Sequence, residues 1–141
     1  MHEFRTLLLG ALSKFNNIHT LKNAIEEIRE IMTEHITNQE RMNTFLGCLA
    51  EQNDMKNTQK KEYIRVYGLA AEIFEESLIP FIPKILSQIT KRLKDGNQEV
   101  HLAYAEALGS IVHNVISNLS EYEDIDNVMD MIFTMIFTNL N

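Results

Sequence analysis

The sequence contains no tryptophan, a single cysteine, two prolines and five glycines among its 141 residues. One cysteine cannot form a disulfide within the chain, so the sequence fits a protein kept in a reducing compartment. An all-β chain of this length would need many more turn-forming residues, which argues against that fold class. No apolar run is long enough to cross a membrane as a helix, and we therefore expect no membrane partner.

Basic residues are also few. The chain has 13 Lys and Arg against 20 Asp and Glu, a formal net charge of −7. Nucleic-acid binding depends on clustered cations that neutralise phosphates, so we expect no nucleic-acid partner. The charge is uneven, because residues 56–65 and 84–94 each hold four basic residues. A local basic edge on an acidic protein is therefore compatible with the sequence.

Apolar and helix-favouring residues, in contrast, are abundant. Apolar residues make up 45% of the chain, and Leu, Ile, Glu, Lys, Met and Ala dominate, which favours helix. Apolar positions recur every three or four residues, as in Leu21, Ile25, Ile28 and Met32, and this spacing places them on one face of a helix. The pattern predicts about seven helices separated by short polar breaks. They span approximately residues 3–15, 21–35, 39–51, 59–76, 80–94, 98–117 and 121–138.

Polar residues and prolines stand where several of these helices are predicted to begin. Thr20, Asn38 and Asn97 suit the N-cap position, where a side-chain oxygen accepts a hydrogen bond from a backbone N–H. Pro80 and Pro83 are predicted in the first turn of the fifth helix, where a missing N–H costs little.

Two stretches of the chain repeat each other at an offset of 41 residues. Residues 60–68 (KKEYIRVYG) align with residues 101–109 (HLAYAEALG), so that tyrosine matches tyrosine and glycine matches glycine. We interpret Gly68 and Gly109 as positions of close helix approach. A period near 40 residues with two helices per unit is typical of HEAT and armadillo repeats. The sequence therefore predicts an all-α protein, an α-solenoid of HEAT-type antiparallel helix pairs.

The predicted array forms one domain over residues 1–141. Its three pairs are expected at about 3–36, 38–77 and 79–117, with a leftover last helix at 121–138. That last helix is apolar on most of its surface, and such a helix should be covered. Either the chain is a fragment of a longer array whose next repeat covers the helix, or a partner covers it. We favour the first alternative.

Patterns that support catalysis are missing from the sequence. The histidines form no His-Glu-x-x-His motif, and no Cys/His cluster has zinc spacing. The glycines are isolated, so no phosphate-binding loop is present. Cys48 lies among Phe45, Leu46 and Leu49, and we interpret it as a buried apolar residue instead of a nucleophile. We therefore expect no enzymatic activity, no metal and no cofactor.

Four stretches of the chain carry a family resemblance. They are FLGCL at residues 45–49, KKEYIRVYG at 60–68, ITKRLKD at 89–95 and ALG at 107–109. Together they resemble the amino-terminal region of the plant tortifolia/spiral family of microtubule-associated proteins. The resemblance covers roughly residues 4–115. In that family this region is a TOG-like array of HEAT repeats.

The resemblance implies a protein-interaction module in the cytoplasm, on the cytoskeleton, with the cilium as a further candidate location. TOG-like arrays bind tubulin along one edge, through the loops that join the two helices of each pair. In this chain those loops correspond to residues 16–20, 52–58 and 94–98. The partner-binding edge that the resemblance implies contains these residues: Asn17, His19, Lys56, Lys60, Lys61, Lys94, Asn97 and His101.

Alternatives stay open for both the edge and the function. The basic residues beside the loops either form a ridge suited to an acidic surface such as tubulin, or are solvated helix ends. The usual arginine of the second HEAT helix is Lys60 in one repeat and His101 in another, and the tryptophan of many TOG first loops is absent. The alternative function is a scaffold or transport adaptor that holds a peptide or helix on the concave face of the array.

Overall fold

The computed structural model describes residues 2–16, 18–51, 57–93 and 97–115, together with 126–127, 129–130 and 133–134. Within these residues the chain is helical and has no strand, which confirms the prediction of an all-α protein. The α-helices of this part are α1 (His2–Ser13), α2 (Ile18–His35), α3 (Gln39–Ala50), α4 (Asn57–Phe74), α5 (Ile82–Leu93) and α6 (Gln98–Asn114). Two 3₁₀ segments, η1 (Lys14–Asn16) and η2 (Glu75–Phe81), follow α1 and α4.

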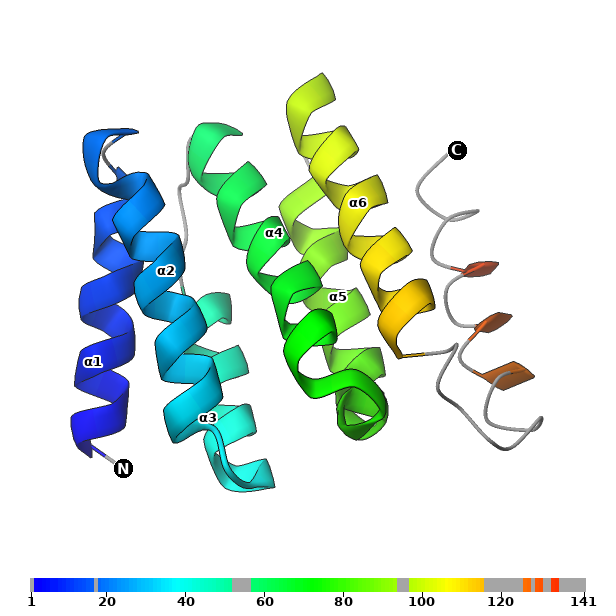
Figure 1. The fold of residues 1–141 in the computed structure, drawn as a ribbon. Coiled ribbons are helices and arrows are strands. Elements are labelled where there is room, and N and C mark those ends of the chain that lie inside the picture. Colours follow the sequence, from blue (N-terminus) through cyan, green and yellow to red (C-terminus); the bar gives the residue numbers. More distant parts are fainter. Residues whose placement is uncertain are drawn as a thin grey trace.

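The helices pack against one another in antiparallel pairs, as predicted (Figure 1). Helices α2, α4 and α6 lie side by side and run in the same direction, with α3 and α5 behind them. Helix α1 packs against both α2 and α3. Helix α4 contacts α2 on one side and, much more extensively, α6 on the other. As a result, α2, α4 and α6 all begin at the same edge of the molecule, the upper edge in Figure 1.

Two of the three predicted N-caps are confirmed. The Asn38 Oδ1 accepts a hydrogen bond from the backbone N–H of Arg41 at 2.9 Å. The Asn97 Oδ1 accepts one from the backbone N–H of Val100 at 3.1 Å. The third cap is wrong, because α2 begins at Ile18 and Thr20 lies inside its first turn. The Thr20 hydroxyl instead donates to the carbonyl of Lys14 at 2.7 Å and ties the start of α2 to η1.

The passage from α4 to α5 also differs from the prediction. Helix α4 ends at Phe74, and Glu75 has a φ of 48°, in the left-handed region where helices commonly stop. The chain continues as η2, which contains Pro80, and α5 begins at Ile82 instead of near Pro80. Pro83 does lie in the first turn of α5, where its missing N–H needs no partner.

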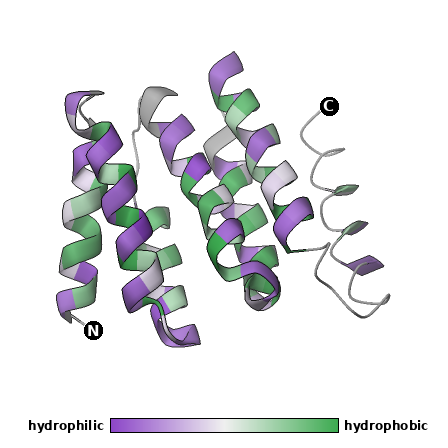
Figure 2. Ribbon diagram, viewed as in Figure 1, coloured by the Kyte–Doolittle hydropathy of each residue, from purple (hydrophilic) through white to green (hydrophobic). Residues whose placement is uncertain are grey.

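A continuous core of buried apolar side chains connects the helices. Figure 2 shows apolar and polar stretches alternating along each helix, as the spacing in the sequence predicts. Cys48 is 0% exposed, which confirms its interpretation as a buried residue. The largest side chains with almost no exposure are Tyr67, Phe45, Leu8, Leu12, Ile28, Met32, Leu46, Leu49, Ile64, Leu78, Ile82 and Ile85.

Helices α4 and α6 approach each other closely at Gly68. A Cβ atom placed on Gly68 would lie 3.4 Å from the Cα of Ala107, so the predicted close approach is confirmed there. The Ser110 hydroxyl donates to the carbonyl of Gly68 at 2.7 Å and fixes the contact. The same interpretation is wrong for Gly109, which is exposed and where an added Cβ would meet no neighbour within 4 Å. The two glycines match in sequence, but only Gly68 faces an adjacent helix.

The predicted last helix, 121–138, falls largely outside the described residues. That it forms, and that a further repeat or a partner covers it, both stay predictions. Of the residues described there, Met129 packs against the core and Phe133 is 49% exposed. Among the helices that the structure describes, none has the length and apolar character needed to cross a membrane.

Candidate functional site

The predicted partner-binding edge corresponds to the end of the molecule where α2, α4 and α6 begin (Figure 1). We call this end the starting edge and define its described members as His19, Lys60, Lys61, Asn97 and His101. The remaining predicted members lie outside the described residues. They are Asn17, Lys56 and Lys94.

The two lysines of α4 are less exposed than the sequence suggested. Lys60 is half-buried, and the Lys61 side chain is 23% exposed. The Lys61 ammonium lies 3.7 Å from a carboxylate oxygen of Glu99 on α6 and 3.9 Å from one of Glu62. Lys61 therefore links the starts of α4 and α6.

The other described members of the starting edge have different environments. Asn97 is the N-cap of α6, and its side-chain oxygen is engaged by the Val100 N–H. His19, in the first turn of α2, and His101, in the first turn of α6, are both exposed. His19 and His101 are thus open to solvent, whereas Asn97 orders the start of α6.

Charges of both signs meet near the starting edge. Glu99 is 63% exposed beside Lys61, and the Lys14 ammonium pairs with Glu27 at 2.5 Å. Glu99 is the more exposed member of its ion pair with Lys61, and ion pairs with such exposure contribute little to folding stability. No three His, Cys, Asp or Glu side chains in the described part are placed to hold a metal ion.

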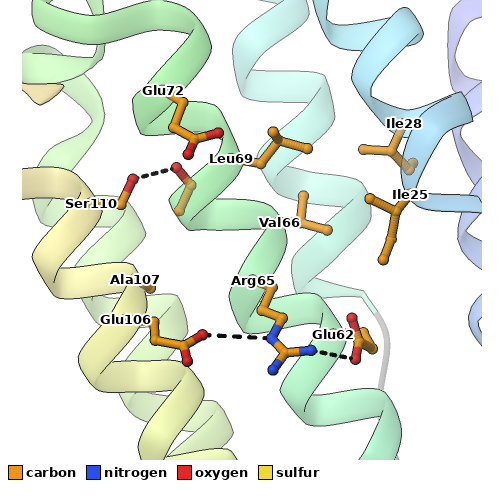
Figure 3. A pocket seen from close by; sticks show the side chains of 11 residues that line it. Ile25, Ile28, Glu62, Arg65, Val66, Leu69, Glu72, Glu106, Ala107 and Ser110 are labelled. Atoms are coloured by element: carbon orange, nitrogen blue, oxygen red, sulfur yellow. Dashed lines mark hydrogen bonds and ion pairs between the residues drawn. The ribbon is translucent and has the colours of Figure 1, made fainter. Parts of the chain in front are cut away.

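A second feature, which the sequence did not predict, is a groove of about 260 Å³ between α2, α4 and α6 (Figure 3). Ile25 and Ile28 of α2 line one side, and Ala107 of α6 lines the other. Val66 and Leu69 of α4 lie between them. The groove is thus built from the layer of helices that all run in one direction.

A chain of charged side chains crosses one end of this groove (Figure 3). The Arg65 guanidinium donates to the Glu62 Oε1 at 3.0 Å, and its Nε lies 3.7 Å from the Glu106 Oε2. Glu62 is only 3% exposed, whereas the side chains of Arg65 and Glu106 are 44% and 54% exposed. The Glu62 Oε2 is buried and has no hydrogen-bond partner.

One signal in the sequence points toward this charged chain. At the offset of 41 residues, Glu62 aligns with Ala103, which is buried, so a carboxylate occupies a position that is apolar in the other copy. Arg65 aligns with Glu106, and the structure brings these two equivalent positions of adjacent helices together. A charge at an otherwise apolar repeat position marks the residue as unusual, although it does not show what the residue contacts.

Cys48 lies beside a charged pair on the other side of the molecule. The Arg5 guanidinium donates to both carboxylate oxygens of Glu51, at 3.0 and 2.7 Å, and approaches the Cys48 Sγ at 3.5 Å. Burial raises the pKa of the Cys48 thiol above its ordinary value, with a smaller opposing effect from Arg5. A thiol held in its neutral form is a poor nucleophile.

Comparison with known proteins gives consistent matches. The chain is 29% identical over 112 residues to TORTIFOLIA1-like protein 1 of Arabidopsis thaliana, which covers 79% of this chain and 14% of that relative. It is 30% identical over 94 residues to TORTIFOLIA1-like protein 2 of the same plant, covering 66% of this chain and 11% of the relative. It is also 29% identical over 112 residues to the microtubule-associated protein TORTIFOLIA1, again of Arabidopsis thaliana, covering 79% and 13%.

The chain thus spans only a small part of the length of these curated relatives. The protein family described as TORTIFOLIA1 N-terminal matches residues 2–141. This match covers nearly the whole chain and agrees with the resemblance found in the sequence. The chain belongs to the TORTIFOLIA1 N-terminal family.

Proposed function

We propose that this chain is a HEAT-type interaction module of a microtubule-associated protein and that it binds tubulin through the starting edge. The observation that carries the proposal is the common edge at which α2, α4 and α6 begin (Figure 1). Family membership supports the partner, because one relative is named a microtubule-associated protein. The side-by-side order of antiparallel pairs supports the interpretation as a solenoid of repeats.

The arrangement suits an acidic partner surface for an electrostatic reason. A helix N-terminus carries a partial positive charge, and three of them lie at the starting edge. Lys60, Lys61 and the two exposed histidines, His19 and His101, add basic side chains there. A surface held in place by packed helices loses little conformational entropy on binding.

The ion pair between Lys61 and Glu99 fits this mechanism. It joins a partly exposed ammonium to an exposed carboxylate at 3.7 Å, so it contributes little to stability and exchanges readily. On binding, a partner's carboxylate takes the place of Glu99 at Lys61. The affinity is then expected to fall steeply with salt, since screening weakens exposed pairs.

The test neutralises the two lysines without reversing them. Lys61→Glu would set a new carboxylate beside Glu62 and Glu99 and destabilise the fold, so Lys60→Gln with Lys61→Gln is the better variant. We expect this double variant to co-sediment with microtubules several-fold more weakly than the unmodified chain. Thermal unfolding, followed by circular dichroism, checks that the fold is retained.

A matched control removes the same charge elsewhere. The control is the double variant Arg29→Gln with Lys84→Gln. Arg29 lies in the second half of α2, and Lys84 lies in the first turn of α5, at the end opposite to the starting edge. Both positions are exposed. We expect this control to sediment with microtubules like the unmodified chain. Equal binding by the lysine variant, or an equal loss in the control, would refute the tubulin-binding edge.

The same proposal includes the organisation and location of the chain. We propose one domain over residues 1–141, with pairs near 3–36, 38–77 and 79–117, on the cytoskeleton in the cytoplasm. Because the relatives are several times longer than the matched region, a further repeat is a natural cover for the apolar residues of 121–138. The function proposed is recognition, and it requires no reaction.

A further inference from the structure

The groove between α2, α4 and α6 carries an excess of negative charge (Figure 3). Three carboxylates line it, those of Glu62, Glu72 and Glu106, against a single cation, the guanidinium of Arg65. That guanidinium is shared, at 3.0 Å from Glu62 and 3.7 Å from Glu106. Charge complementarity therefore favours a ligand that brings positive charge to this groove.

Glu62 gives the groove a specific need for a hydrogen-bond donor. Its side chain is 3% exposed, and its Oε1 is contacted by Arg65 and, at 3.9 Å, by Lys61. Its Oε2 is buried without a hydrogen-bond partner, which is uncommon for a carboxylate in a folded protein. An ionised carboxylate oxygen only accepts hydrogen bonds, so a donor group with positive charge is its best partner.

The rest of the groove is apolar and small. Ile25, Val66 and Leu69 form much of its wall, and Leu69 is only 9% exposed. Its volume, about 260 Å³, lies below the ~300–1,000 Å³ of pockets that enclose drug-sized ligands. Long basic side chains suit such a site, because their methylene stems pack on apolar surface while the charged head reaches a carboxylate.

We propose that this groove binds a basic side chain, lysine or arginine, presented by a polypeptide segment of a partner protein. The aliphatic stem lies against Val66 and Leu69, and the charged head is held by the carboxylates at one end of the groove, Glu62 and Glu106. A single metal ion is a poorer occupant, because in the described part no three such side chains are placed to hold one. Apolar walls beside the carboxylates also favour a stem with carbon atoms.

This surface adjoins the one in the proposed tubulin interaction but has the opposite charge. The starting edge presents lysines and helix N-termini to an acidic partner, whereas the groove presents carboxylates to a basic one. Arg65 and Glu106 both lie further along their helices than the starting edge. The two sites meet at Lys61, which lies 3.9 Å from Glu62, so the groove variants leave both lysines unchanged and their test does not depend on microtubules.

The experiment measures binding of a fluorescein-labelled synthetic peptide in which arginine alternates with leucine, by fluorescence anisotropy. A second peptide has glutamate in place of every arginine. We expect the arginine peptide to bind with a salt-dependent affinity and the glutamate peptide not to bind. The double variant Glu72→Gln with Glu106→Gln is expected to raise the Kd of the arginine peptide by about tenfold or more.

The control variant removes two carboxylates from the same layer of helices but outside the groove. Glu30→Gln with Glu34→Gln changes two exposed positions of α2. We expect this control to bind the arginine peptide with an affinity within about twofold of the unmodified chain. Glu62→Gln is a third variant, and its thermal unfolding shows whether any loss of peptide binding by that variant comes from a loss of folding.

The outcomes are decisive in both directions. Loss of peptide binding in Glu72→Gln with Glu106→Gln, but not in the α2 control, supports the site. Equal binding by both double variants overturns it, as does an arginine peptide that binds no better than the glutamate peptide. If microtubule sedimentation fails while the peptide result holds, the edge is refuted and the groove stands.

Discussion

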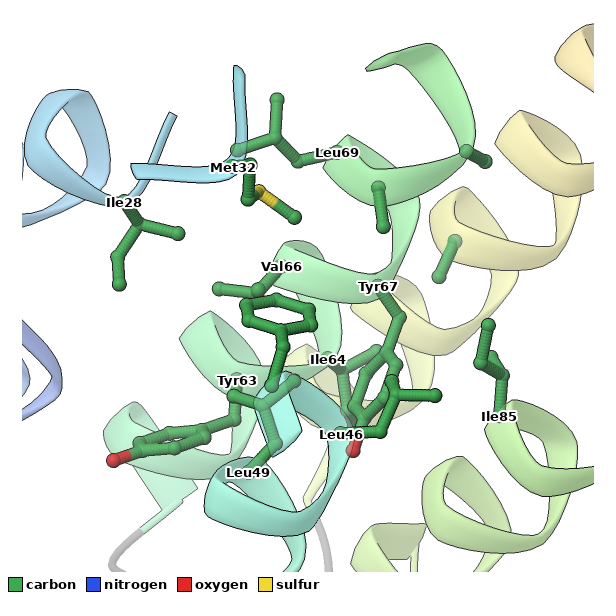
Figure 4. Packing of buried hydrophobic residues seen from close by; sticks show 14 of the residues in the cluster. Ile28, Met32, Leu46, Leu49, Tyr63, Ile64, Val66, Tyr67, Leu69 and Ile85 are labelled. Atoms are coloured by element: carbon green, nitrogen blue, oxygen red, sulfur yellow. The ribbon is translucent and has the colours of Figure 1, made fainter. Parts of the chain in front are cut away.

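The Tyr67 hydroxyl of α4 donates a hydrogen bond of 2.5 Å to the side-chain Oε1 of Gln88 on α5, in a buried setting. Tyr67 is 0% exposed and Gln88 is 8% exposed. Figure 4 shows the Tyr67 ring among apolar neighbours, with Ile64, Leu46 and Ile85 close by. The bond therefore joins two helices of different layers through the middle of the core, where an unmet acceptor is costly.

We expect Tyr67→Phe to lower the free energy of unfolding by about 1–3 kcal/mol, because the buried Gln88 oxygen loses its donor. Urea denaturation measures the change. Gln88→Leu is also expected to lower the free energy of unfolding, because the Tyr67 hydroxyl then loses this acceptor. If the two groups act as a pair, the double variant loses clearly less than the sum of the two single losses. Additive losses would show that the bond is not a coupled interaction.

The contact between α4 and α6 predicts a strict size limit at Gly68. Gly68→Ala places a methyl group at ordinary contact distance, 3.4 Å from the Cα of Ala107, and gains helix propensity. We expect its unfolding free energy to change by less than about 1 kcal/mol. Gly68→Leu should overpack the contact and cost about 1–3 kcal/mol.

Gly109 offers the matched control for that size limit. It is also helical, but an added Cβ there would meet no neighbour within 4 Å. Gly109→Leu is therefore expected to raise stability by about 0.5–1 kcal/mol through helix propensity. Thermal unfolding of both leucine variants compares the two sites directly. A large loss at Gly109 would contradict its exposed position.

Glu75 predicts a stabilising substitution at the end of α4. Its φ of 48° costs an L-residue about 1–2 kcal/mol, whereas glycine adopts it freely. After the greater flexibility of glycine in the unfolded chain is subtracted, we expect Glu75→Gly to raise stability by up to about 1 kcal/mol. The neighbouring Glu76→Gly is the control and should lower stability. A loss at Glu75 as large as that at Glu76 would argue against the left-handed stop.

Two buried groups predict how stability changes at alkaline pH. Burial raises the pKa of the Cys48 thiol and of the Tyr104 phenol. Both groups are neutral below their unfolded pKa values, about 8.5 and 10, so their contribution is fully present there. It is lost as the pH rises, because the unfolded chain then releases protons that the folded chain retains.

The measurement is the free energy of unfolding as a function of pH between neutral and strongly alkaline solution. We expect it to fall above about pH 8.5. Tyr104→Phe should reduce the slope of that fall at the highest pH, and Cys48→Ala should reduce it at the lower end of this range. The slope decides, since each substitution also shifts stability by a constant amount. An unchanged slope in both variants would contradict the assignment.

The helices were predictable because their apolar spacing is regular and their caps are local. Asn38 and Asn97 each bond a backbone N–H three residues on, and such a contact depends on few other residues. The conformation of Glu75 could not be predicted, because glutamate is not a usual residue for the left-handed region. The N-cap prediction for Thr20 was wrong because its hydroxyl donates a hydrogen bond to the carbonyl of Lys14 instead of accepting one from a backbone N–H.

The candidate surfaces were less predictable for a related reason. The sequence shows that Lys60 and Lys61 are basic, but only the structure shows that Lys61 forms an ion pair with Glu99 of the next helix pair. The groove depends on Glu62, Arg65 and Glu106 meeting across two helices, and the alignment of the repeats shows only that the last two positions are equivalent. Contacts between helices require their relative placement, which composition and spacing do not provide.

The unequal packing of α4 against its two neighbours has a mechanical consequence. Between α4 and α6, the Gly68 contact and the Ser110 bond clamp two backbones together, so α4 to α6 should respond to load as a stiff block. Toward α2 the contact is much slighter and the acidic groove intervenes. Among the described helices, a lateral force is therefore expected to separate α2 from α4 before it separates α4 from α6, which places the groove at the weaker of the two contacts.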